Sequence, residues 1–142
     1  MEELTGNYCI AQGCPKSTLL ATTKLHTCRF IRTPKSWDDA QIFCESLGGN
    51  LFVPNDLDEN DSVALVAPEW TALWIGGTDQ QSEGTWVDPN GTGLTFTNWC
   101  DFASQPNGAG NCVIMDTRQW WEWFGEWWDD YCSNKRPSIC EF

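Results

Sequence analysis

Trp127-Trp128-Asp129-Asp130-Tyr131-Cys132 stands near the end of the chain, after Gln105-Pro106-Asn107 and Cys112. These segments place the carbonyl-bearing side chains of Gln105, Asn107 and Asp129 between two cysteines and among several tryptophans. Core packing or solvent exposure alone would not produce this pattern. A region that concentrates oxygen ligands and aromatic rings between cysteines is therefore predicted to bind a ligand.

The length and the cysteine content indicate one secreted domain. We treat residues 1–142 as a single domain with an N-terminal arm over 1–13, because this length allows a sizeable core. Eight cysteines indicate an oxidising, extracellular compartment. No Cys-x-x-Cys pair occurs and there is a single histidine, which argues against a zinc site.

Other features agree with secretion. The chain has two N-glycosylation sequons, Asn60-Asp61-Ser62 and Asn90-Gly91-Thr92. Met1-Glu2-Glu3 is not a signal peptide, so we expect that one was removed before it. No apolar run reaches the roughly 18 residues that a membrane span needs.

The charge balance narrows the ligand class. Acidic residues outnumber basic ones 20 to 8, which gives a net charge of −12. Phosphate backbones require clustered Lys and Arg, and none cluster here, so the composition argues against nucleic acid. Cations, mineral surfaces and neutral polar ligands fit better, although the acidity also fits simple solubility.

The secondary-structure pattern predicts an α+β domain with two short helices in its first half. Ser36 is expected to cap the first helix, with Asp39 in the capping-box position and Gly48-Gly49 as the stop. The second helix is expected over residues 56–67 and ends at Pro68. The predicted apolar helix positions are Trp37, Ala40, Cys44 and Leu47, then Leu57, Ala64 and Leu65.

Strands and one long loop are predicted in the second half. Leu73-Trp74-Ile75 is expected to be a buried strand that two glycines interrupt, and further strands are expected over residues 112–115 and 138–142. Residues 76–111 are rich in Gly, Asn, Thr, Asp and Pro and predict an irregular loop, which in a compact domain is usually functional. The stretch up to Cys28 suggests a disulfide-linked hairpin.

Together these residues resemble the C-type lectin-like domain over residues 14–142. The resemblance rests on motifs in the family order: Cys14-Pro15, the helix ending in Cys44, Trp74-Ile75-Gly76, Asn98-Trp99, Gln105-Pro106-Asn107 and the Trp-x-Asp-x-x-Cys pattern at 127–132. It implies a fold of two helices, small antiparallel sheets and a long irregular loop region, held by disulfides.

The resemblance also implies a disulfide pattern. Its pairs are Cys14–Cys28, typical of the long form of the domain, Cys44–Cys140 and Cys112–Cys132. Cys9 and Cys100 remain, and they are expected either to pair with each other or to link this chain to a partner, as in a disulfide-linked homodimer.

A calcium and glycan site follows from the same resemblance. It implies that Gln105, Asn107 and Asp129 ligate calcium and bind sugar, since calcium prefers six to eight oxygens. Trp128 stands where the family has a ligating Asn, and the triplet has two neutral amides, so calcium affinity should be weak and the sugar class stays open. The alternative is that Gln105-Pro106-Asn107 binds no ligand and only forms a tight turn, with Asp129 as a hydrogen-bonding residue of a strand. An auxiliary site at Asp79 and Glu83 is also implied, although loop bracing is the stronger expectation.

The tryptophans suggest a second way to bind sugar. Trp74, Trp86, Trp99 and Trp127 are assigned to packing, whereas Trp120, Trp121, Trp123 and Trp128 are candidates for an exposed platform that stacks on sugar rings. The alternatives are a hydrophobic cluster under the long loop and a dimer contact.

The predicted function is that of a secreted carbohydrate-binding domain with weak or partial calcium dependence and tryptophan stacking. The alternative is a calcium-independent module that binds proteins or surfaces, including mineral or ice. Catalysis is not expected, because His26 is the only histidine and no Ser-His-Asp or Cys-His arrangement can be built.

Overall fold

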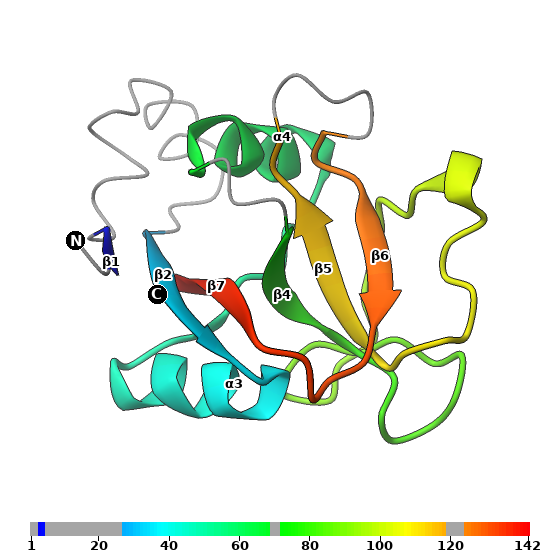
Figure 1. The fold of residues 1–142 in the computed structure, drawn as a ribbon, viewed down its shortest axis with the longest axis horizontal. Coiled ribbons are helices and arrows are strands. Elements are labelled where there is room, and N and C mark those ends of the chain that lie inside the picture. Colours follow the sequence, from blue (N-terminus) through cyan, green and yellow to red (C-terminus); the bar gives the residue numbers. More distant parts are fainter. Residues whose placement is uncertain (1–2, 5–26, 69–71, 119–123) are drawn as a thin grey trace.

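The computed structural model describes residues 3–4, 27–68, 72–118 and 124–142. Within these residues the chain forms one sheet flanked by two helices, with residues 3–4 and the C-terminus on one side and the long loop on the other (Figure 1). This arrangement confirms the α+β C-type lectin-like fold that the sequence predicts.

The sheet is mixed rather than purely antiparallel. Its strands are β1 (Glu3–Leu4), β2 (Cys28–Lys35), β3 (Asn50–Leu51), β4 (Ala72–Thr78), β5 (Cys112–Asp116), β6 (Trp127–Asp130) and β7 (Arg136–Glu141). They lie in the order β1-β2-β7-β4-β5-β6, and β3 pairs with β7. The contact between β4 and β7 is parallel, because the chain crosses the sheet after β6 and enters beside β4 in the same direction.

Both expected helices form, and the polar residue directly before each helix caps its N-terminus. In α3 (Trp37–Ser46) the Ser36 hydroxyl accepts the Asp39 N–H at 3.2 Å, and in α4 (Leu57–Val66) the Asp56 carboxylate accepts the Glu59 N–H at 2.9 Å. No helix among the described residues is long and apolar enough to cross a membrane.

The apolar face of α4 differs from the expected one. Leu57 and Leu65 are exposed, whereas Val63 and Ala64 are buried together with the polar Glu59 and Asn60. The reason is tertiary, because on the buried face Asn60 donates to the Gly125 carbonyl and accepts the Trp127 indole N–H.

Side chains of the central strands alternate between two cores. On β4, Leu73 and Ile75 pack into the core that contains α4, whereas Trp74 packs into the core that contains α3. Successive side chains of a strand point to opposite faces. The two helices therefore cover opposite faces of the sheet, and β4 is buried on both.

Gly76 and Gly77 do not end the strand, contrary to prediction. β4 runs through them to Thr78. A Cβ at Gly76 would lie 2.5 Å from Val53 Cγ2, and one at Gly77 would lie 2.7 Å from Val113 Cγ2. Glycine is required here because neighbouring segments approach the strand closely, and the expected interruption is present only as a shift in the β4–β5 register between Trp74 and Thr78.

The structure forms the disulfides Cys44–Cys140 and Cys112–Cys132, the same pairs that the resemblance implies. Cys28 is buried in β2, and its expected partner Cys14 lies outside the described residues, as does Cys9. Cys100 is a fully buried thiol that forms no disulfide within the described part of the chain. Burial and a hydrogen bond to Glu126 raise the pKa of this thiol, which lowers the fraction present as the reactive thiolate.

The asparagines of the two sequons differ in solvent exposure. The amide of Asn60 is buried, where it donates to the Gly125 carbonyl at 2.9 Å and accepts the Trp127 indole N–H at 2.8 Å. Asn90 is exposed in a turn. Of the two asparagines, Asn90 is therefore the one accessible for glycosylation in the folded protein, and Asn60 joins α4 to β6.

Candidate functional site

The long loop after β4 covers the outer edge of β6. Figure 1 shows this loop, which includes the 3₁₀ helix η1 (Asp101–Ala103), on the side of the sheet away from β1 and the C-terminus. The Trp127 N–H donates to the Asn98 carbonyl at 2.8 Å, and the Cys100 N–H donates to the Trp127 carbonyl at 2.9 Å. The Asp129 N–H donates to Gln105 Oε1 at 3.1 Å. The loop thus satisfies backbone groups of an edge strand that would otherwise be unpaired.

The three expected ligand residues meet at this edge. Asp129 is 8% exposed, and its Oδ1 and Oδ2 accept the N–H groups of Asn107 and Gly110, each at 3.1 Å. Gln105 faces the same strand through its Oε1, and the Gln105–Pro106 bond is cis. The convergence that the sequence predicts is therefore present.

The same contacts make this set a poor fit for calcium. Both Asp129 carboxylate oxygens, Gln105 Oε1 and Asn107 Oδ1 each accept a backbone N–H, the last from Ala109 at 2.9 Å. A cation would have to compete with four hydrogen bonds for one carboxylate and two neutral amides. In the residues that the structure describes, no group of three His, Cys, Asp or Glu side chains could hold a metal ion, so a cation here would depend on amide and backbone oxygens. The metal set remains a prediction.

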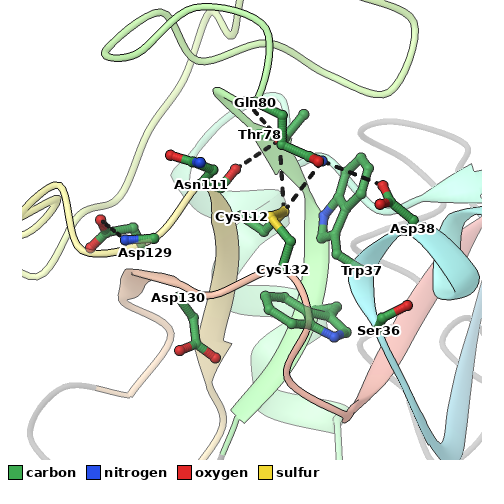
Figure 2. Close-up of a disulfide and its surroundings, with 12 residues drawn as sticks. Ser36, Trp37, Asp38, Thr78, Gln80, Asn111, Cys112, Asp129, Asp130 and Cys132 are labelled. Carbon is green, nitrogen blue, oxygen red and sulfur yellow. Dashed lines mark hydrogen bonds between the residues drawn. A yellow bond between two sulfur atoms is a disulfide. The ribbon is translucent and has the colours of Figure 1, made fainter.

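Trp128 lies on the other face of the sheet from Asp129. Along β6, Trp127 and Asp129 are buried, whereas Trp128 and Asp130 are half-buried on the opposite face. Figure 2 shows the carboxylates of Asp129 and Asp130 pointing in different directions, as strand alternation requires. Trp128 and Asp129 therefore do not present their side chains to one ligand, contrary to the expectation from the sequence. Trp120, Trp121 and Trp123 lie outside the described residues.

The tryptophans assigned to packing form the interior of the loop region. Trp127 is buried beneath Phe96 and Trp99, with each ring pair meeting edge to face at a centroid distance of 5.8 Å, and Trp86 tilts against Trp99 at 4.8 Å. Trp74 is fully buried in the core with α3. This aromatic layer supports the loop from below, with Trp127 fully buried and Trp86, Phe96 and Trp99 half-buried.

Two exposed aromatic residues beside the site were not singled out by the sequence. Tyr131 follows β6 directly and is 60% exposed, and Phe102 lies in η1 and is 78% exposed. Gly110 packs against the backbone of Asp130 and Tyr131, which places Tyr131 next to the turn that carries Asn107. Single aromatic residues in irregular segments have no periodicity, so no pattern could have identified them.

Gly110 allows this turn to lie against β6. A Cβ at Gly110 would lie 2.1 Å from the Asp130 carbonyl carbon and 2.6 Å from the Tyr131 nitrogen. We expect Gly110→Ala to lower the free energy of unfolding by about 1–3 kcal/mol, because backbone must move. Gly93→Ala, where nothing lies within 4 Å, is the matched control and should be nearly neutral in the same urea titration. Equal losses in the two variants would contradict this packing.

The predicted auxiliary pair forms a brace. Asp79 is 1% exposed, and its Oδ2 accepts the Gly84 N–H at 2.8 Å. When the Asn111 amide is oriented so that its nitrogen faces the two carboxylates, the orientation that satisfies its neighbours, this nitrogen lies 2.9 Å from Asp79 Oδ1 and 3.2 Å from Glu83 Oε1 and donates to both. Asp79 and Glu83 thus hold the loop, as the sequence favoured.

Gln80 joins this brace to α3 beside the Cys112–Cys132 disulfide (Figure 2). Thr78 Oγ1 donates to the Asn111 carbonyl at 2.7 Å. The Gln80 amide nitrogen lies 3.5 Å from Cys112 Sγ and 3.4 Å from Asp38 Oδ1, in the first turn of α3. The loop is therefore anchored at both of its ends.

Comparisons with known proteins agree with this architecture. The model of the family "Lectin C-type domain" matches residues 33–142. Tetranectin of Homo sapiens is 30% identical over 140 residues, which cover 92% of this chain and 67% of tetranectin.

Two solved structures each align with 82% of this chain. A calcium-independent type II antifreeze protein has a TM-score of 0.72 and 25% identity, over 85% of its chain. The carbohydrate-recognition domain of cow CD23, solved in the presence of a GlcNAc2Man3 oligosaccharide, has a TM-score of 0.71 and 29% identity, over 87% of its chain. Since the family model matches most of the chain, the protein belongs to the C-type lectin domain family.

Proposed function

We propose that this domain is an extracellular glycan-binding module whose site is the turn at Gln105–Asn107 along β6, and whose binding depends only weakly on calcium. The observation that carries this proposal is the pair of hydrogen bonds from the Asn107 and Gly110 N–H groups to the Asp129 carboxylate. They hold the turn in shape through the chain's own groups, so a metal is not needed to organise it.

The chemistry of the turn suits sugar hydroxyls. Asn107 is exposed and its amide can donate and accept at the surface, as can the partly exposed amide of Gln105. Tyr131 is exposed and its backbone lies against Gly110 of the same turn, so we expect its ring to offer an apolar face to the C–H side of a sugar ring. We therefore replace Trp128 by Tyr131 as the candidate stacking residue. The similarity to a domain solved with an oligosaccharide supports this class of ligand.

Calcium would add little to such a site. When bound, it would offer coordination to sugar hydroxyls, and Gln105, Asn107 and Asp129 would be its ligands. Their oxygens already accept backbone N–H groups, so occupancy should require calcium at or above about 1 mM, the weak end for extracellular modules.

A second candidate function is binding to a protein or a solid surface without calcium. The similarity to a calcium-independent antifreeze protein favours it, because the same fold serves that role without metal. This candidate predicts no glycan binding under any condition.

A glycan array with and without chelator tests the proposal. We expect one class of glycan to bind in both conditions, and Asp129→Ala to weaken binding at least about tenfold, or ~1.4 kcal/mol, because two turn N–H groups lose their acceptor. Asp88→Ala is the matched control, since Asp88 Oδ1 accepts two backbone N–H groups in another turn of the same loop. It should leave binding unchanged.

Three results would decide against the proposal. Complete loss of binding in chelator would favour the calcium mechanism that the family resemblance implies. Absence of binding to any glycan would favour the protein or surface binder. Equal losses in Asp129→Ala and Asp88→Ala would mean that the whole loop, and not the turn at residues 105–107, determines binding.

A further inference from the structure

The brace at Asp79 brings three acidic or carbonyl oxygens around one amide nitrogen. Asp79 Oδ1, Glu83 Oε1 and the Gly110 carbonyl lie 2.9, 3.2 and 3.2 Å from the Asn111 side-chain nitrogen. Asp79 is 1% exposed, whereas Glu83 and Asn111 reach the surface. Two carboxylates this close repel each other unless a donor or a cation lies between them.

Asn111 has the geometry to supply that donor. Its amide carries two N–H groups and a partial positive charge, enough to satisfy both carboxylates by charge-assisted hydrogen bonds. Its backbone is held in place as well, because its carbonyl accepts the Thr78 hydroxyl at 2.7 Å and the Asp79 N–H at 3.0 Å. The side chain therefore stays between Asp79 and Glu83.

We propose that the Asn111 amide takes the place of a divalent cation between Asp79 and Glu83, so that the 79–84 and 107–111 segments are joined without metal. The Asn111 side-chain nitrogen decides whether these two carboxylates meet a donor or need a cation. Replacing the amide nitrogen by an oxygen, as in Asn111→Asp, removes the donor and leaves three carboxylates and the Gly110 carbonyl around one point. Such a set of oxygens is one that calcium prefers.

Thermal unfolding measured by tryptophan fluorescence, in chelator and in about 5 mM calcium, tests this proposal. The turn at Gln105–Asn107 is expected to bind calcium only at or above about 1 mM, so any rise of the wild-type midpoint in calcium should be unchanged in Glu83→Gln. The midpoint of Asn111→Asp should fall by about 3–6 °C in chelator and recover in calcium, because the ion relieves the repulsion.

The double variant Asn111→Asp with Glu83→Gln is the matched control. It keeps the new carboxylate but removes one of the three, so the recovery in calcium should be lost. Isothermal titration of calcium into Asn111→Asp and Asn111→Ala provides a second measurement that does not depend on the midpoint, and only the aspartate variant should bind.

The proposal is overturned if calcium neither binds to nor stabilises Asn111→Asp, or if the wild-type midpoint rises in calcium and Glu83→Gln abolishes that rise. None of these readouts uses a glycan, so the result stands apart from the proposed function. A wild-type domain that binds no sugar can still carry this amide brace.

Discussion

Replacing Cys44 and Cys140 together by alanine is expected to lower the free energy of unfolding by about 4–5 kcal/mol. This disulfide closes a loop with a sequence separation of 96 residues, and in the chain-entropy model the denatured state gains most when such a long loop opens. Both cysteines are fully buried in the core with α3, so the loss of packing adds to the effect. Urea titration of the purified variant under non-reducing conditions measures the loss.

The second disulfide is the internal comparison. Cys112–Cys132 has a sequence separation of 20 residues, and its removal should cost about 3 kcal/mol in the same model. The order of the two losses tests the entropic argument more strictly than either value. A larger loss for the short loop would mean that anchoring of the site, and not chain entropy, dominates at Cys112.

Trp127→Ala should cost at least about 4 kcal/mol, because a buried indole is lost from the core. Its ring meets Phe96 and Trp99, and its N–H donates to Asn60 Oδ1 at 2.8 Å. The truncation creates a cavity and leaves a buried acceptor unpaired. Glycan binding should fall as well, because the ring supports the loop segment that pairs with the Trp127 backbone.

Trp127→Phe tests the contribution of the indole hydrogen bond to Asn60 separately from that of the ring contacts. It retains most ring contacts and should cost about 1–3 kcal/mol, the usual range for an unsatisfied buried polar group. Combined with Asn60→Ala, the loss should be smaller than the sum of the single losses, since both substitutions remove one interaction. Additive losses in urea titrations would show that the Asn60 contact contributes nothing.

Local features of this chain could be predicted because they depend on neighbouring residues. The Ser36 cap involves an N–H three residues away and formed as expected, and the second helix formed close to its expected bounds, with Asp56 as its cap. The irregular composition of residues 76–111 likewise predicted a long loop with little regular structure. The convergence of Gln105, Asn107 and Asp129 followed from the family resemblance.

Features that depend on distant partners could not be predicted in this way. Asn60 begins a glycosylation sequon, yet its amide forms hydrogen bonds with Gly125 and Trp127, which are 65 and 67 residues away. The sequence suggests that Gly76 interrupts a strand, yet Gly76 lies inside β4. The close approach of Val53 leaves no room there for a Cβ. Neither role has a local sequence pattern.

The sequence by itself determined the family, the capped helices and the residues that meet at the edge of β6. Only the tertiary structure decided what those residues do there. The pairing of β6 with β5 places Trp128 on the face opposite to Asp129. The packing of the loop against β6 commits the Asp129 oxygens to backbone N–H groups, and the approach of residue 111 to Asp79 sets an amide where a cation would fit. Residue types determine which groups can bind, but the partners that the folded backbone brings to each group determine which of them remain available.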